Sequence, residues 1–241
     1  MLNSEQFPAF CAHRGLSGIL PENSMSAFGA AWGLGADELE LDIRLTKDEK
    51  LVISHDDHLQ RVAGRPGLIQ DFTLEELTKI QLDPHNACIS YFTTPEMLFA
   101  RFGGSIILNL HIKESRANEK VIRQIASLIH AHHLEDSVYF AASAPELQQM
   151  ECFAPEIRRC AIQLPRDTIP ILDVAQRYGC FRVQLWRDMF DQALINTFHD
   201  KGIRCNLYYA DTPEDIWKYT AMGIDVILTN RIDVAKSDFA K

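Results

Sequence analysis

Short apolar segments alternate with helix-like segments along most of the chain, and this alternation restricts the fold more than any other feature. Helical patterns such as residues 25–34 and 118–132 separate the apolar segments. Strict alternation of strands and helices predicts a parallel sheet with right-handed crossovers. Eight such units in 241 residues are typical of a closed (β/α)8 TIM barrel. The eight predicted strands are residues 7–13, 38–43, 106–112, 138–142, 160–164, 181–186, 205–209 and 226–229.

An open, doubly wound sheet is the alternative α/β fold. Such sheets commonly carry a G-x-G-x-x-G or P-loop motif, and the chain has neither. We therefore predict a single-domain TIM barrel over residues 1–241. Residues 57–91 are interrupted by glycine and proline, and we expect them to form a short insertion after the second strand, over one mouth of the barrel. One short helix is expected there at residues 73–77, opened by a capping box.

The second predicted strand alternates acidic and aliphatic residues, with Glu38, Glu40 and Asp42 at every second position. A strand places such residues on one face. Carboxylates on one face repel one another, so they need either solvent or a bound cation. Glu40 and Asp42 offer the hard oxygen ligands that Mg²⁺ or Ca²⁺ prefers. Glu38 lies deeper, where it either pairs with a cation inside the barrel or contacts solvent.

Further polar and aromatic side chains fall at the ends of predicted strands. In a TIM barrel these ends meet at one mouth, where catalytic residues lie. A single histidine is more often an ordinary hydrogen-bonded residue, and a lysine or an aromatic residue can simply cover the surface or pack. Their coincidence at one mouth is what predicts an active site. The residues are His13, Arg14, His55, His111, Lys113, Trp186 and Tyr208.

Charge and composition exclude several classes of protein. The net charge of -9 and the absence of a lysine- or arginine-rich block argue against a nucleic-acid partner. We see neither a leader pattern in the first residues nor an apolar run long enough to cross a bilayer. The six cysteines form no C-x-x-C pair, and several are expected to be buried thiols. We predict a cytoplasmic enzyme without stable membrane association; no pattern indicates an oligomeric state.

Several motifs resemble, in order and spacing, those of the glycerophosphodiester phosphodiesterases, whose fold is a TIM barrel. The resemblance is densest in the first 60 residues, resumes at Lys113 and ends at residues 223–230. The early motifs are His13-Arg14-Gly15, Pro21-Glu22-Asn23-Ser24, Gly35-Ala36-Asp37, Glu40-Leu41-Asp42, Thr46-Lys47-Asp48 and His55-Asp56.

The resemblance implies hydrolysis of a small phosphodiester, a glycerophosphodiester, to glycerol-3-phosphate and an alcohol with the help of a divalent metal ion. His13 and His55 would be the acid–base pair, because imidazole exchanges protons near neutral pH. Glu40, Asp42 and a third residue from the strand at 106–112 would bind the metal. The substrate and its phosphate would be held by Arg14, Lys113, Trp186 and Tyr208.

The chain departs from the family pattern at the third metal ligand. The family usually has an acidic residue two positions before the lysine, and this chain has His111. By family the ion would be Mg²⁺ or Ca²⁺, whereas an imidazole nitrogen suits Mn²⁺, Co²⁺ or Zn²⁺ better. Two further departures are Asp211, where the family's Trp-Thr-Val-Asn run ends in asparagine, and Asn230, where the family has aspartate.

Three functions are consistent with these patterns. The first is a metal-dependent phosphodiesterase, which the pair His13 and His55 favours. The second is a catalytically weakened relative that binds a phosphorylated polyol, which His111 favours. The third is a lyase-type relative that closes a cyclic phosphate on a lysophospholipid, and the lack of an amphipathic membrane-facing stretch argues against it. We predict the first.

Overall fold

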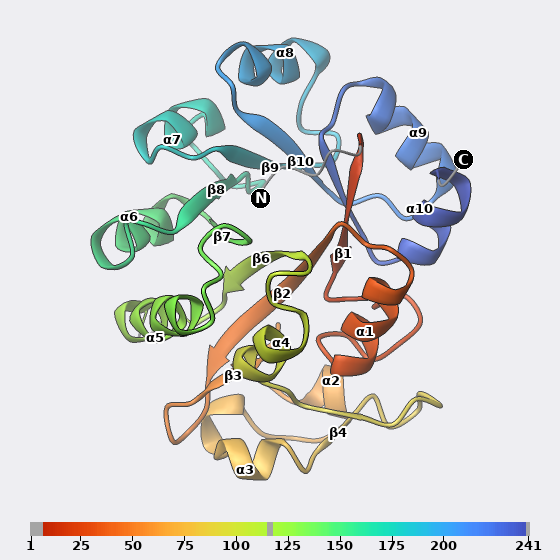
Figure 1. Ribbon diagram of the computed structural model, residues 1–241, viewed down its shortest axis with the longest axis vertical. Helices are drawn as coiled ribbons and strands as arrows, with labels where there is room; N and C mark the ends of the chain where they lie inside the picture. The colour runs from red at the N-terminus through yellow and green to blue at the C-terminus, as the bar shows by residue number, and fades with distance from the viewer. Residues whose placement is uncertain (1–6, 115–117, 240–241) are drawn as a thin grey trace.

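Eight parallel strands close into a barrel that helices surround (Figure 1). The computed structural model describes residues 7–114 and 118–239. Strand β1 pairs in parallel with both β2 and β11, and these pairings close the sheet. The predicted (β/α)8 TIM barrel is therefore confirmed. The barrel strands are β1 (Ala9–His13), β2 (Glu38–Leu45), β6 (Ile107–Ile112), β7 (Val138–Ala142), β8 (Arg158–Ile162), β9 (Arg182–Trp186), β10 (Arg204–Tyr208) and β11 (Val226–Thr229).

Four of the surrounding helices begin at a residue whose side chain satisfies a free backbone N–H group. Ser24, Thr94, Asp191 and Thr212 each accept a hydrogen bond from the first turn of their helix. Strand β8 lies two residues earlier than predicted, because it begins at two arginines that hide its apolar pattern, and α10 was not predicted. The ends of the other barrel strands differ from prediction by at most two residues. The helices are α1 (Met25–Gly33), α4 (Pro95–Phe102), α5 (Asn118–Ala131), α6 (Ala144–Phe153), α7 (Ile171–Arg177), α8 (Gln192–Asp200), α9 (Pro213–Ala221) and α10 (Ile232–Phe239).

The segment after β2 leaves the barrel as a hairpin and a small folded insertion, at the bottom of Figure 1. Strand β3 (Leu51–Ile53) pairs antiparallel with β2. The expected helix is α3 (Leu74–Leu77), and its capping box from Thr73 to Glu76 is present. The insertion has more structure than predicted, and its elements are short enough to escape detection by periodicity. They are α2 (Gln60–Ala63), the 3₁₀ helix η1 (Ile69–Asp71), β4 (Gln81–Leu82) and β5 (Ser90–Tyr91).

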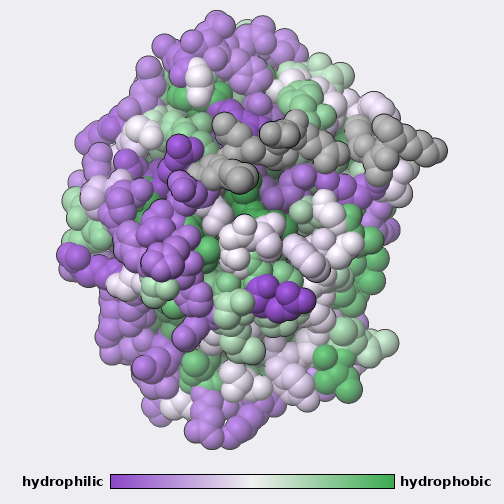
Figure 2. All heavy atoms as spheres, viewed as in Figure 1, coloured by the Kyte–Doolittle hydropathy of each residue, from purple (hydrophilic) through white to green (hydrophobic). Residues whose placement is uncertain are grey.

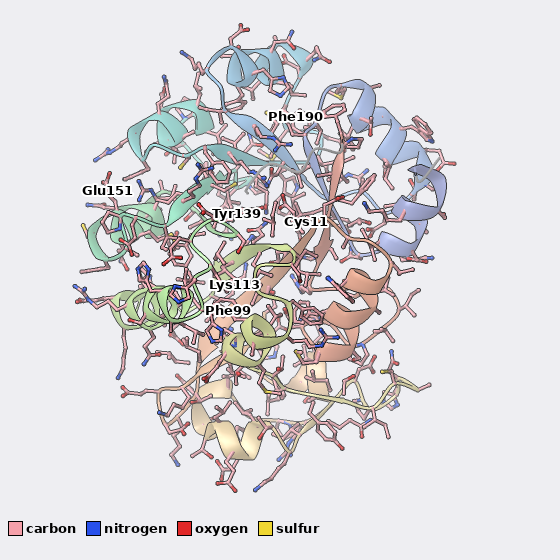
Figure 3. All side chains as sticks on the ribbon, viewed as in Figure 1. Cys11, Phe99, Lys113, Tyr139, Glu151 and Phe190 are labelled. Atoms are coloured by element: carbon pink, nitrogen blue, oxygen red, sulfur yellow. The ribbon has the colours of Figure 1, made fainter. Side chains whose placement is uncertain are left out.

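The alternation along β2 separates the core outside the barrel from the barrel interior. Leu39, Leu41 and Ile43 pack into the hydrophobic core that the surrounding helices complete. Glu38 points inward, where Nη1 of Arg182 lies 2.6 Å from its Oε1 and the Tyr139 hydroxyl donates to its Oε2 over 2.8 Å. Glu38 is fully buried, so pairing with a cation is confirmed and contact with solvent is not observed. Tyr139 lies within the ring of helices in Figure 3, whereas Glu151 lies on the outer side of α6.

The outer surface is largely hydrophilic, and most of the cysteines are buried, as expected from the sequence. Hydrophilic residues predominate along the left and upper edges of Figure 2, over the outer helices. Four of the six cysteines, all of them free thiols, are buried. Within residues 7–114 and 118–239, no helix is both long and apolar enough to cross a bilayer. The expected absence of a leader concerns residues 1–6, and the predicted domain limits include residues 240–241; both segments lie outside the described residues.

Candidate active site

Strand register brings the predicted metal ligands to one mouth of the barrel. His13 on β1 stands beside Glu40 on β2, and Asp42 stands beside His111 on β6. The side chains of all four residues are nearly or fully buried. Three neighbouring parallel strands, each ending at the same edge, are enough to assemble this cluster.

Cations surround the two carboxylates. Nε of Arg14 lies 3.3 Å from Oδ2 of Asp42, and Nζ of Lys113 lies 3.4 Å from its Oδ1. The Asn23 amide donates to Oδ2 of Asp42 over 2.9 Å. The backbone N–H of Arg14 donates to Oε2 of Glu40 over 2.9 Å. Arg14 and Asn23 both have positive φ, which turns the loop after β1 back over the carboxylates.

The pKa values of the two carboxyl groups shift in opposite directions. Burial raises the pKa of Glu40 well above its usual range, and the negative charge of Asp42 adds to this effect. Burial opposes the ionisation of Asp42 as well, but the positive charges of Lys113 and Arg14 outweigh it and hold the pKa of Asp42 far below its usual range. Burial and the charge of Lys113 keep the pKa of His111 well below normal. The imidazole of His111 is therefore neutral and able to act as a ligand.

Three buried atoms of this cluster accept no hydrogen bond from the described residues: Oε1 of Glu40, Oδ1 of Asp42 and Nε2 of His111. Buried polar atoms normally have partners, because leaving them unsatisfied costs about 1–3 kcal/mol each. Ligand atoms of these three side chains lie within 4.8 Å of one another. Two carboxylates and an imidazole form a donor set that suits a divalent transition metal. The residues present therefore fit a metal ion.

His13 is held in place from outside the cluster. Its Nδ1 lies 2.8 Å from Oδ1 of Asn230, which follows β11, and its Nε2 lies 3.9 Å from Oε2 of Glu40. Burial, with the positive charge of Arg14 as the second cause, lowers the pKa of His13 to about 4. Its imidazole is therefore neutral at neutral pH and able to accept a proton.

His55 lies on the loop after β3 and is more exposed than His13, with 34% of its side chain accessible. Its Nδ1 lies 2.7 Å from Oδ1 of Asp56. Arg61 of the insertion donates to Asp56 over 2.6 Å and to both carboxylate oxygens of Glu22. Glu22 in turn accepts a hydrogen bond from Arg14 over 3.0 Å. A chain of ion pairs therefore connects the insertion to His55 and to the arginine on Asp42.

One barrel mouth thus holds two histidines, two cations and a pair of acidic residues. Comparison with known proteins finds a family that matches the segment carrying them. The family model of the glycerophosphoryl diester phosphodiesterase family matches residues 13–137, a segment that contains every one of these groups. The chain belongs to this family.

Members of the glycerophosphoryl diester phosphodiesterase family resemble the chain over nearly its whole length. The putative glycerophosphodiester phosphodiesterase YhdW of Bacillus subtilis is 26% identical, over 94% of this chain and 96% of its own. The glycerophosphodiester phosphodiesterase of Caldanaerobacter subterraneus is 27% identical, over 91% of this chain and 92% of its own. An Oleispira antarctica phosphodiesterase, solved in complex with the product sn-glycerol-3-phosphate, superposes with a TM-score of 0.83 at 21% identity, covering 96% of this chain and 97% of its own.

The predicted substrate-binding aromatics lie beside this site. The ring of Tyr208 lies 5.1 Å from that of His13 and 5.0 Å from that of Trp186. On the other side of the site, a cavity of about 270 Å³ lies along the ends of β6, β7 and β8. Its lining includes His111, Lys113, Ser143, Glu146 and Leu164. Figure 3 shows Lys113 inside the ring of helices, next to this side of the barrel.

All nine residues that the sequence nominated therefore lie at one mouth, connected by direct contacts or through Asp56, Arg61 and Glu22. The prediction missed residues that hold them in position. Asn23 and Asp56 lie within quoted motifs, so a signal for them existed. Arg61, Asp211 and Asn230 were not among the predicted site residues, and the fold brings them to the site. Asp211 and Asn230 are departures from the family pattern, which was the one available hint.

Proposed function

We propose that the chain is a metal-dependent phosphodiesterase that hydrolyses a glycerophosphodiester to glycerol-3-phosphate and an alcohol. The observation that carries the proposal is the cluster of unsatisfied ligand atoms on Glu40, Asp42 and His111, at the same barrel mouth as His13 and His55. The product complex of the Oleispira antarctica phosphodiesterase supports this choice of product. Trp186 and Tyr208 would contact the organic part of the substrate.

The two histidines would divide the proton transfers. One accepts the proton of the attacking hydroxyl group, which belongs to water or to the glycerol moiety, and the other protonates the leaving alkoxide. Arg14 and Lys113 would hold phosphate oxygens, and their charges would stabilise the negative charge on those oxygens in the transition state. Burial of the site strengthens these interactions because little water screens them.

A metal ion bound by Glu40, Asp42 and His111 would act as a Lewis acid toward a phosphate oxygen. Binding would ionise Glu40, whose proton is displaced by the cation. Since His111 contributes nitrogen in place of a third carboxylate, the site should favour Mn²⁺, Co²⁺ or Zn²⁺ over Mg²⁺ or Ca²⁺.

One observation favours the alternative, a weakened relative that binds a phosphorylated polyol. Arg14 and Lys113 already lie 3.3 and 3.4 Å from Asp42, so its charge is neutralised without a metal ion. A phosphate group could then be held by the two cations alone. The distinction between the two functions is whether the bond to phosphorus is broken.

The test is an assay of glycerophosphocholine hydrolysis with each of Mg²⁺, Ca²⁺, Mn²⁺, Co²⁺ and Zn²⁺, and with a chelator. Release of glycerol-3-phosphate with one of these metals, abolished by the chelator, supports the proposal. A cyclic glycerol phosphate would identify the substrate hydroxyl as the nucleophile. Binding of glycerol-3-phosphate without turnover of any diester would support the alternative and reject the enzyme.

Replacement of His111 by glutamate should change metal preference. The substitution supplies a hard oxygen ligand and one more negative charge, so we expect Mg²⁺ to bind on the order of tenfold more tightly. Zn²⁺ and Co²⁺ should lose part of their advantage. Titration calorimetry of wild type and His111→Glu with Mg²⁺ and Zn²⁺ measures both changes.

The matched control is His85→Glu, which places the same charge on an exposed histidine in the insertion. It should leave the Mg²⁺ affinity unchanged. If His111→Glu binds Mg²⁺ no better than His85→Glu does, His111 is not a metal ligand.

A further inference from the structure

The amide of Asn230 lies between a carboxylate and His13. Its Nδ2 donates to Oδ2 of Asp211 over 2.8 Å, and its Oδ1 lies 2.8 Å from Nδ1 of His13. Ser17 donates a second hydrogen bond to Oδ1 of Asn230, over 2.9 Å. Both the amide nitrogen and the amide oxygen of Asn230 are therefore engaged, on opposite sides.

Asp211 determines which way this amide points. Its Oδ1 accepts hydrogen bonds from the backbone N–H of Asn230, over 2.7 Å, and from the Thr229 hydroxyl, over 3.0 Å. Its Oδ2 faces the Asn230 side chain. An ionised carboxylate can only accept hydrogen bonds, so the side of Asn230 that faces it must be the NH₂ group. The carbonyl oxygen is then left to face His13.

The direction of the amide decides the tautomer of His13. Because the carbonyl oxygen of Asn230 can only accept, Nδ1 of His13 must carry the ring proton. In the neutral imidazole, Nε2 then holds the lone pair, and it points toward Glu40 at 3.9 Å. His55 is oriented in a similar way, since its Nδ1 lies 2.7 Å from the Asp56 carboxylate, which holds a proton on that nitrogen whether the ring is neutral or charged.

We propose that Asp211 and Asn230 are positioning residues, which together keep His13 in the Nδ1–H tautomer, so that the lone pair of Nε2 can accept a proton at the reaction centre. Neither touches the reacting atoms; both act through His13. The inference rests on the proposed function for its catalytic consequence, but the tautomer itself is measurable without any reaction. It also gives a physical meaning to the two departures, because the asparagine and aspartate of the family pattern have exchanged places here.

Asp211→Asn isolates this role. The backbone N–H of Asn230 and the Thr229 hydroxyl still require an acceptor, so Oδ1 of the new asparagine keeps facing them. Its NH₂ group then faces the NH₂ group of Asn230. Two donors cannot pair, so the Asn230 amide rotates and presents NH₂ to His13. Nδ1 must become the acceptor, and the proton moves to Nε2.

The double variant Asp211→Asn/Asn230→Asp should restore the arrangement. Oδ1 of asparagine at 211 accepts from the backbone and Thr229, and its NH₂ group donates to the new aspartate at 230. That aspartate accepts from Nδ1 of His13 and from Ser17. Every hydrogen bond of the wild-type network is kept, and the Nδ1–H tautomer returns.

Nitrogen-15 NMR of the histidine rings at about pH 8, where an ordinary imidazole is neutral, reads the tautomer directly, with His13→Gln identifying the signal. We expect Nδ1–H in wild type, Nε2–H in Asp211→Asn and Nδ1–H in the double variant. The kcat for glycerophosphocholine should fall about 100-fold or more in Asp211→Asn and recover in the double variant. The matched control is Asp233→Asn, in the partly buried ion pair with Arg231. It should change neither the tautomer of His13 nor kcat.

An unchanged tautomer in Asp211→Asn, or an Nε2–H tautomer that persists in the double variant, would overturn the proposal. If Asp211→Asn folds too poorly for NMR, the double variant decides, since it must show Nδ1–H with intact folding. If wild type turns over no diester but the tautomers change as expected, the positioning role stands and the proposed function fails.

Discussion

His13→Gln should lower kcat for glycerophosphocholine by about 100- to 10,000-fold, the range of a lost general acid or base. Glutamine keeps a polar side chain of similar reach but cannot exchange a proton at neutral pH. Because the pKa of His13 is lowered to about 4 by burial and by Arg14, the wild-type imidazole is neutral and ready to accept a proton. Steady-state kinetics with a saturating metal ion measure the loss.

Two measurements separate catalysis from folding and metal binding. The melting temperature and the metal affinity of His13→Gln should stay close to wild type, since His13 is not one of the proposed ligands. His85→Gln, at an exposed position, should leave kcat unchanged. A kcat for His13→Gln within about threefold of wild type, far less than a lost acid–base group causes, would remove His13 from the chemistry.

Arg182→Met should destabilise the barrel by about 3–5 kcal/mol, the usual cost of removing one partner from a buried ion pair. Both Arg182 and Glu38 are fully buried, and the pair is 2.6 Å apart. Without the guanidinium, the Tyr139 hydroxyl is the remaining hydrogen-bond donor to the Glu38 carboxylate among the described residues. For a chain of this size the loss corresponds to a fall in melting temperature of about 6–20 °C.

Arg166→Met removes an arginine that is exposed, so it should change the free energy of unfolding by less than about 0.5 kcal/mol. Adding Glu38→Gln to Arg182→Met should recover part of the stability, because the stranded charge is then gone. Denaturant unfolding of wild type, Arg182→Met, Glu38→Gln and the double variant completes the double-mutant cycle. A double variant as unstable as the sum of the two single variants would show that packing, not charge, dominates at this site.

The fold followed from sequence because its signals are local and repeated. Each barrel strand, Ile107–Ile112 for instance, is a short apolar segment between helices, and eight repetitions leave few topologies. The period of two along β2 likewise placed Glu38, Glu40 and Asp42 on one face of the strand, and the structure shows that Glu38 on this face pairs with Arg182 inside the barrel. The insertion resisted prediction because elements as short as Gln60–Ala63 contain too few residues to show a period.

The site was predictable to the extent that its residues follow strand ends. His13, Asp42 and His111 are brought together by register, which a strand count reproduces. The partner of Glu38 was not identifiable, because Arg182 lies 144 positions away and arginines are usually at the surface. Arg61 reaches the site through loop geometry, which no periodic pattern records.

The insertion has a consequence for how the length of such an enzyme can vary. Its two ends are neighbours, since the backbone N–H of Ile53 donates to the carbonyl oxygen of Thr93 over 2.9 Å. It also has its own hydrophobic cluster, which includes Leu59, Ile69 and Leu77. The part of this segment that follows His55 and Asp56 can therefore vary in length while the barrel strands, with their ligands, keep their register. Changes in the length of the insertion can thus arise without disturbing the groups on the barrel strands, provided that His55 and Asp56 are kept.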